Sequence, residues 1–251
     1  RHFHAPIVSS VFDFGRNGAL PSHPELLDWL AVELVRADYR MKPLHRLLVT
    51  SAAYRRVSST GGNSLAQERD PENRLLWRMN VGRMEAEVVR DSVLHLAGRL
   101  DPTLGGPELE NNQALTTFRR SLYYSCQPED DGKSPFGALF DGPEPADCYR
   151  RSKTIIPQQA LALTNSSLVV EQARELAQRL TMELVAQGEP GTPAFVVAAT
   201  QQILARTPSV AEMEACLAFL GPQDVDSQIA ASRRAGLVRV LLNHNDFIAI
   251  R

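Results

Sequence analysis

Two carboxylates and one histidine are the side chains in this sequence that could carry out hydrolysis. They are Asp91 and Asp141, with His45 as a proton shuttle. A glycosidase-like reaction needs two carboxylates that flank one bond at roughly 5–10 Å from each other. Histidine changes its charge near neutral pH and can pass protons between such groups. An enzyme with these paired carboxylates is therefore one hypothesis for this chain.

Basic and amide side chains near the middle of the chain indicate a second kind of chemistry. Planar guanidinium groups bind sulfate, carboxylate or phosphate through two hydrogen bonds, and amides orient hydroxyl groups. A carboxylate-rich stretch from 129 to 147 directly precedes some of the arginines, so ion pairs within the loop are the other interpretation. The candidate ligand-binding residues are Arg119, Arg120, Arg150, Arg151, Gln158 and Gln159.

Four polar residues recur at four-residue spacing in the segment from 83 to 100. Arg83, Glu87, Asp91 and His95 would lie on one ridge of a helix. One interpretation is a ladder of ion pairs on a half-buried helix. The alternative is that Asp91 and His95 face a cleft.

Several catalytic and cofactor motifs are missing from the sequence. It has no GxSxG elbow, no glycine-rich phosphate loop, and no HxxxH or HExxH pair, so we predict no metal site. Its three cysteines form no CxxCH motif, so this chain does not house a covalently attached haem. A bridge between Cys126 and Cys148 would close the irregular segment, and reduced thiols are the alternative.

Hydrophobic periodicity predicts helices over most of the chain. Ser22 with Glu25 and Ser209 with Glu212 have the spacing of capping boxes, and Asp70 also resembles a helix start. The segment from 83 to 100 is apolar over most of its circumference, which is typical of a central helix. Proline and glycine interrupt the stretch from 101 to 156, where residues 118–124 are the only credible strand.

These patterns predict an all-α fold: an irregular helical bundle with a long, turn-rich central loop and at most a small β-hairpin. We expect one domain over residues 1–251, truncated at its N-terminus, with 101–156 as an irregular, insertion-like segment. The formal net charge of −2 disfavours nucleic-acid binding. Charges interrupt every apolar run before the ~20 residues of a membrane span, so none is expected.

Seven strings, read in order, resemble one family and cover almost the whole chain. The family is the C-terminal PSD domain of planctomycete proteins that also carry a cytochrome c-like domain, and its function is unknown. The strings are DFGRNGALPSHPELLDWLA (13–31), KPLHRLLVTSAAYR (42–55), DPENRLLWR (70–78), RMEAEVVRDSVL (83–94), RRSLYY (119–124), FDGPEPADCYRRSKTIIPQQALALTNS (140–166) and LLNHNDFI (241–248).

The resemblance implies a setting and not a reaction. It implies a periplasmic or cell-envelope location, haem c in a separate domain, and a second uncharacterised domain in the same polypeptide. It also implies work on polysaccharides. Our first hypothesis is therefore a non-catalytic assembly or ligand-binding domain for a polysaccharide or another polar or anionic ligand. The alternative is an enzyme, either a carbohydrate-active hydrolase or a redox enzyme coupled to the cytochrome.

Overall fold

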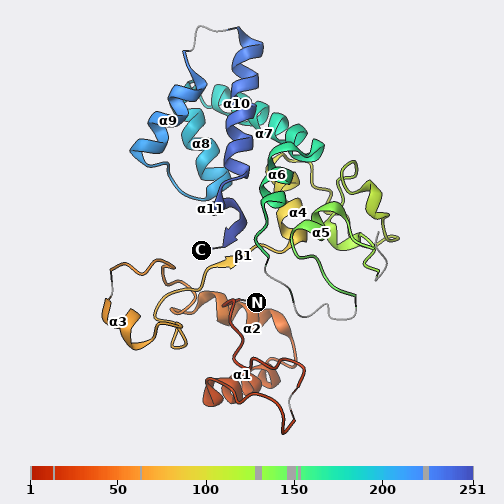
Figure 1. The fold of residues 1–251 in the computed structure, drawn as a ribbon, viewed down its shortest axis with the longest axis vertical. Helices are drawn as coiled ribbons and strands as arrows, with labels where there is room; N and C mark the ends of the chain where they lie inside the picture. Colours follow the sequence, from red (N-terminus) through yellow and green to blue (C-terminus); the bar gives the residue numbers. More distant parts are fainter. Residues whose placement is uncertain are drawn as a thin grey trace. The chain divides into compact units, whose positions relative to one another are not determined.

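The structure, a computed structural model, describes residues 2–13, 15–62, 64–127, 132–145, 151, 154–222 and 226–250. Helices dominate this part of the chain, and its one sheet has two short strands (Figure 1). The all-α prediction with at most a small β-hairpin is therefore confirmed. The chain divides into two compact units, residues 1–82 with 249–251 and residues 83–248. That all 251 residues form one domain stays a prediction.

The first unit is built on helices that bury little of their surface. Its helices are α1 (Pro24–Arg36), α2 (Met41–Thr50) and α3 (Ser64–Arg69), and none contains a buried residue. Helices α1 and α2 lie beside each other and are joined by a short turn (Figure 1). Among the described residues of this unit, the buried ones are Asn73, Met79 and Gly82. This unit therefore has a small core.

The second unit holds the larger core. Its helices are α4 (Ala86–Leu96), α5 (Pro135–Leu139), α6 (Pro157–Asn165), α7 (Ser167–Ala186), α8 (Thr192–Leu204), α9 (Val210–Leu220), α10 (Ser227–Leu242) and α11 (Asn245–Ile248). Two 3-10 turns, η1 (Asn111–Gln113) and η2 (Ser121–Tyr123), interrupt the segment between α4 and α5. Strand β1 (Gly82–Arg83) pairs with β2 (Ala249–Ile250).

Helix α7 is the longest and packs against α10, α8 and α6. Its stripe of Ala173, Leu176, Ala177 and Leu180 is almost completely buried, as the periodicity of the sequence predicts. Apolar side chains removed from water at this spacing supply most of the stability of such a helix. Helices α7 and α10 thus form the framework of the second unit.

Helix α4 is central, as predicted, although it is shorter than the expected 83–100. Val89, Val93 and Leu94 are at most 1% exposed. The helix begins at Ala86 and ends at Leu96. One polar residue, Arg90, lies on the same buried side and is 0% exposed. Its guanidinium donates hydrogen bonds to the loop that follows α4, and these contacts build the site described below.

Three local predictions are wrong. His23 and not Ser22 precedes α1, without a side-chain cap, and the Ser22 hydroxyl hydrogen-bonds to the ring of His23. Asp70 starts no helix, because its carboxylate accepts from the amides of the turn that follows it. Residues 118–124 form no strand: they contain η2 and two isolated bridges, Asp101 with Arg119 and Leu109 with Tyr124.

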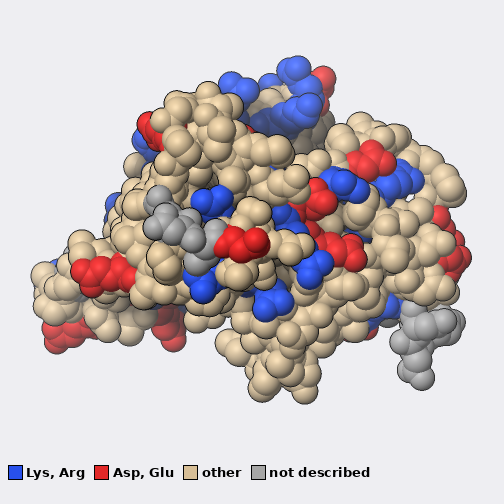
Figure 2. Space-filling view, turned by 90° about the horizontal axis from the view of Figure 1, so that it is seen from above, with Lys and Arg blue, Asp and Glu red and all other residues tan. Residues whose placement is uncertain are grey.

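Other predicted features hold. Ser209 and Glu212 form the complete capping box at the start of α9. Among the described residues, no helix combines the length and hydropathy needed to cross a membrane. Figure 2 shows acidic and basic side chains interspersed over the face viewed from above, in agreement with the nearly balanced charge of the sequence.

Candidate functional site

The buried guanidinium of Arg90 organises the loop that follows α4. Nε donates to the carbonyl oxygen of Ala114 at 2.9 Å, Nη2 to that of Thr117 at 2.6 Å, and Nη1 to that of Arg119 at 2.9 Å. The hydroxyls of Ser121 and Tyr124 accept further hydrogen bonds from it. Burial lowers the pKa of this guanidinium from its ordinary value, partly offset by Tyr124 and Asp91, yet an arginine stays charged in proteins.

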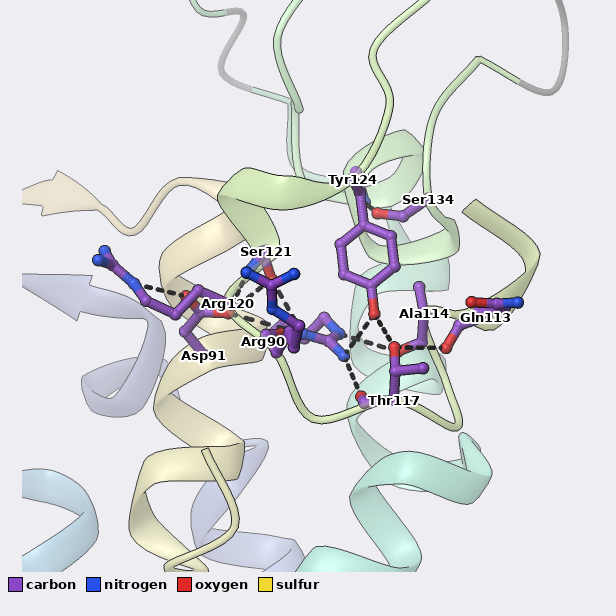
Figure 3. Close-up of polar contacts among 11 residues, drawn as sticks. Arg90, Asp91, Gln113, Ala114, Thr117, Arg120, Ser121, Tyr124 and Ser134 are labelled. Carbon is purple, nitrogen blue, oxygen red and sulfur yellow. Dashed lines mark hydrogen bonds and ion pairs between the residues drawn. The ribbon is translucent and has the colours of Figure 1, made fainter. Parts of the chain in front are cut away.

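Tyr124 and Thr117 complete this polar cluster (Figure 3). The ring of Tyr124 lies against the guanidinium carbon of Arg90, 5.0 Å from its centroid, a cation–π contact. The hydroxyls of Tyr124 and Thr117 also hydrogen-bond to each other. A charged group is stable in a core only when its hydrogen-bonding capacity is used, and here the loop supplies the acceptors. The loop therefore folds around Arg90.

Asp91, one residue further along α4, fixes the same loop from a second direction. Its Oδ1 accepts from the backbone amide of Ser121 at 2.8 Å and from the Ser121 hydroxyl at 2.6 Å (Figure 3). Its Oδ2 lies 3.8 Å from Nε of Arg120, and its Oδ1 lies 3.6 Å from Nη1 of Arg90. This predicted catalytic carboxylate thus has a set of structural partners.

Asp141, the second predicted carboxylate, is occupied elsewhere. Its two carboxylate oxygens accept from the backbone amide and the hydroxyl of Thr154, both at 2.8 Å. Its φ of 57° is in the left-handed region, where aspartate is tolerated better than most side chains. Asp91 and Asp141 thus bind different segments. His45 belongs to the first unit and lies 2.8 Å from the ring nitrogen of His2. A reaction that combines the three residues stays a prediction.

The ladder expected along residues 83–95 does not form. Arg83 lies in β1 and donates to the carbonyl oxygen of Thr154 and to the side chain of Gln159. Glu87 accepts two hydrogen bonds from Arg151. His95 is exposed and has no side-chain hydrogen bond or ion pair with described residues. For Arg83, Glu87 and Asp91, long-range partners therefore replace the neighbours expected at four-residue spacing.

The predicted ligand-binding residues have separate environments. Arg119 lies over the ring of Tyr123 and donates to the carbonyl oxygen of Gly105, whereas Arg120 points towards Asp91 (Figure 3). Gln159 is buried and donates to the carbonyl oxygen of Leu139. A shared ligand for these side chains stays a prediction. Two members of the set remain: Gln158 is exposed, and Arg150 lies outside the described residues.

The described cysteine side chains have few chemical partners. Cys126 is a free thiol that donates to the carbonyl oxygen of Pro143, and burial raises its pKa. Cys148, the other half of the bridge considered above, lies outside the described residues. Within the described ranges no three His, Cys, Asp or Glu residues group as metal ligands.

Described residues of the second unit line two hollows that bear on the site. The smaller, of about 120 Å³, adjoins the Arg90 cluster and is lined in part by Glu87, Ser121 and Lys133. The larger, of about 760 Å³, lies between α7 and α10, and sequence reasoning missed it. We call it the α7–α10 groove. A ligand pocket is typically 300–1,000 Å³, so only the larger hollow has the size for an extended ligand.

Small residues on α10 form one wall of the α7–α10 groove. They are Ala230, Ala231, Ala235 and Gly236. A Cβ on Gly236 would come within 3.2 Å of the Phe219 ring of α9, so a larger residue there would disturb the packing behind the groove. The small residues on either side of Arg233 and Arg234, in the string AASRRAG at 230–236, were the signal in the sequence, although they do not say what lies opposite.

All charged residues among the described ones that line the α7–α10 groove are basic. Arg174, Arg234 and Arg239 line it, and no carboxylate does. Arg234 is held in place by a 3.1 Å hydrogen bond to the Thr181 hydroxyl and by the ring of Phe195. The side chains of Arg174 and Arg239 have no hydrogen bond or ion pair with the rest of the described chain. Two cationic groups are therefore available to a ligand.

The described residues thus form a mostly helical structure, with a groove between α7 and α10 and a loop fixed by buried polar contacts. The chain belongs to the PSD1 family, described as a protein of unknown function (DUF1553), whose sequence model matches residues 1–220. This match confirms the PSD resemblance. No curated protein and no solved structure matches the chain.

Proposed function

We propose that this chain is a non-catalytic assembly and ligand-binding domain whose ligand is an anionic polysaccharide held in the α7–α10 groove. The observation that carries the proposal is the pair of unpartnered guanidinium groups, Arg174 and Arg239, in a groove without a described carboxylate. Unpaired arginines at a concave surface favour sulfate or carboxylate groups, because the guanidinium forms two parallel hydrogen bonds with such oxyanions.

The neutral polar residues of the α7–α10 groove suit the rest of a sugar chain. Its lining includes amides and hydroxyls, which donate to and accept from sugar hydroxyl groups. Gln178, Gln228 and Ser232 are exposed on the two helices. Anionic groups along a polysaccharide would contact the arginines while hydroxyl groups between them contact these residues.

The non-catalytic part of the proposal is supported by the contacts of the candidate carboxylates. Asp91 and Asp141 each accept two hydrogen bonds from a single neighbouring residue, Ser121 and Thr154 respectively. A carboxylate engaged in this way positions a backbone segment and is poorly placed to act as a nucleophile or base. Neither residue lines the α7–α10 groove.

The wider setting is part of the same proposal and rests on the family resemblance. The domain would belong to a larger periplasmic or cell-envelope protein. A cytochrome c-like domain would hold haem c, and a second uncharacterised domain would complete the polypeptide. This chain would then bring a polysaccharide close to its partner domains.

A thermal-shift comparison of matched oligosaccharides tests the proposal. A ligand that binds only the folded chain stabilises it by RT ln(1 + [L]/Kd), about 2.7 kcal/mol at 100 times Kd. Sulfated dextran oligosaccharides should raise the melting temperature, and uncharged dextran of equal length should raise it less. Equal shifts, or none with any sulfated or carboxylated chain, would reject an anion-selective groove.

A further inference from the structure

Two hydrogen bonds show that α7 and α10 run in opposite directions along the α7–α10 groove. Arg234, near the middle of α10, donates to the hydroxyl of Thr181 in the second half of α7. Asn243, directly after α10, donates at 2.9 Å to the hydroxyl of Thr164, three residues before the start of α7. The end of α10 therefore lies beside the start of α7, and the two helices are antiparallel.

This arrangement places Arg174 and Arg239 at the same end of the groove. Arg174 precedes Thr181 by seven residues, and Arg239 follows Arg234 by five residues. At 1.5 Å per residue these steps are about 10 Å and about 8 Å. Because the helices are antiparallel, both steps lead towards the same end, and the two arginines differ in level by only about 3 Å. The axes of packed helices are about 8–10 Å apart, a span that two extended arginine side chains cover.

The opposite end of the groove has a different chemistry. Its lining includes Met182, Ser227 and Gln228, which carry no charge. Arg234 lies between the two ends, but its guanidinium is already engaged by Thr181 and Phe195. Just beyond the uncharged end, the carboxylate of Asp226 caps α10 by accepting from the amide of Gln228. An anion is therefore favoured at the Arg174–Arg239 end and disfavoured at the other.

We propose that Arg174 and Arg239 together hold one tetrahedral oxyanion, a sulfate or phosphate ester of the bound sugar chain. This inference rests on the function proposed above and narrows it to one kind of charged group. Neither guanidinium has a hydrogen bond or ion pair with the rest of the described chain. Two cations on facing walls repel each other, and an anion bound between them replaces this repulsion with attraction.

The shape of the anion decides between the candidate groups. A guanidinium binds an oxyanion best through two parallel hydrogen bonds to two oxygens of the same group. A carboxylate has one such pair of oxygens, which a single arginine occupies. A sulfate or phosphate ester has three terminal oxygens, so it presents two pairs to arginines that approach from different sides. The uncharged sugars would then extend towards Met182.

Calorimetric titration of the full chain with four dextran hexasaccharides tests the shape of the anion. The hexasaccharides differ only at C6 of the non-reducing terminal sugar, which carries a sulfate, a phosphate, a carboxylate or a free hydroxyl. At least one of the two esters should bind about 10-fold or more tightly than the hydroxyl form, and the carboxylate clearly less tightly than that ester. The stronger ester identifies the source of the oxyanion. A carboxylate that binds as tightly as both esters overturns the proposal.

Single variants test whether both arginines bind the same group. Arg174→Gln and Arg239→Gln should each weaken binding of the preferred singly charged ester about 10-fold. Arg46→Gln, at an exposed position in the first unit, is the control and should keep its affinity. Circular dichroism verifies that each variant is folded.

The outcome separates this inference from the function on which it rests. If only one of the two variants weakens the singly charged ester, while both weaken a fully sulfated dextran oligosaccharide, the arginines bind separate anions. The shared site is then overturned and the anion-selective groove stands. If neither the singly charged nor the fully sulfated sugars bind, both proposals are wrong.

Discussion

Nη1 of Arg90 donates a 2.9 Å hydrogen bond to the carbonyl oxygen of Arg119, 29 residues further along the chain. The same guanidinium binds two other carbonyl oxygens of the loop. Backbone carbonyl groups that face a core need donors, and a buried arginine supplies five in one plane. A single side chain of α4 therefore replaces the regular secondary structure that this loop lacks.

Replacing Arg90 should strongly destabilise the chain. Arg90→Met keeps much of the side chain's volume but leaves several buried acceptors without donors, which costs about 3–5 kcal/mol of unfolding free energy. Arg99→Met is the matched control, because Arg99 is exposed and only stacks on Phe118, at 4.8 Å. It should cost about 1 kcal/mol or less. Urea denaturation of both variants measures the difference, and similar losses would refute the role of Arg90.

Asp91 and Ser121 should be energetically coupled. Asp91→Ala leaves the amide and hydroxyl of Ser121 without their acceptor, so a loss of about 1–3 kcal/mol is expected. Ser121→Ala removes one of the two donors and should cost less. In a double-mutant cycle the combined loss should be smaller than the sum by about 1 kcal/mol. Additive losses would show that the contact contributes little.

The two predicted capping serines form a matched pair. Ser209→Ala removes the hydrogen bond to the amide of Glu212 and should cost about 1 kcal/mol. Ser22→Ala should cost clearly less, because the Ser22 side chain makes no cap for α1. Thermal or urea unfolding of the two variants measures this difference. Equal losses would contradict the structure, because they would mean that Ser22 stabilises its helix as much as the capping residue Ser209 does.

The pair of Arg206 and Glu212 should make stability depend on pH. Hydrogen bonds from Arg206, and then from the backbone and hydroxyl of Ser209, hold the pKa of Glu212 far below its ordinary 4.5. A lowered folded-state pKa stabilises the chain above the unfolded-state pKa, and this contribution is lost as pH falls through the folded-state value.

The variant Glu212→Gln measures that contribution. Both side chains are more than a third exposed, so solvent screening limits the contribution to about 1 kcal/mol. Between pH 7 and pH 3 the original chain should lose this much more unfolding free energy than Glu212→Gln. Parallel stability curves for the two proteins over that range would contradict the assignment.

Helices with a strong apolar stripe could be predicted from the sequence. The period of 3.6 residues in α7 reports its buried side directly, and the Ser209–Glu212 capping box is a local pattern that the structure reproduces. The same reasoning was wrong for Ser22, whose hydroxyl bonds to a neighbouring histidine. A local pattern names the groups that can pair, and other nearby partners compete for them.

The site was harder to predict because its partners are far apart in the sequence. Four-residue spacing suggested that Glu87 pairs along its helix, but Arg151 reaches it across 64 residues. Arg90 binds backbone carbonyl groups. Every residue carries such a group, so the sequence does not indicate which ones the arginine will contact. The α7–α10 groove depends on two helices whose approach the sequence does not specify. Here tertiary packing decided the outcome.

Calorimetric titration of a sulfated dextran oligosaccharide tests the central claim most directly. The double variant R174Q/R239Q should bind about 10- to 100-fold more weakly than the original chain, since two charge-assisted contacts are lost. The double variant R16Q/R46Q changes the net charge equally at exposed arginines of the first unit, and it should keep its affinity. Equal weakening in both variants, or none in R174Q/R239Q, would contradict binding in the α7–α10 groove.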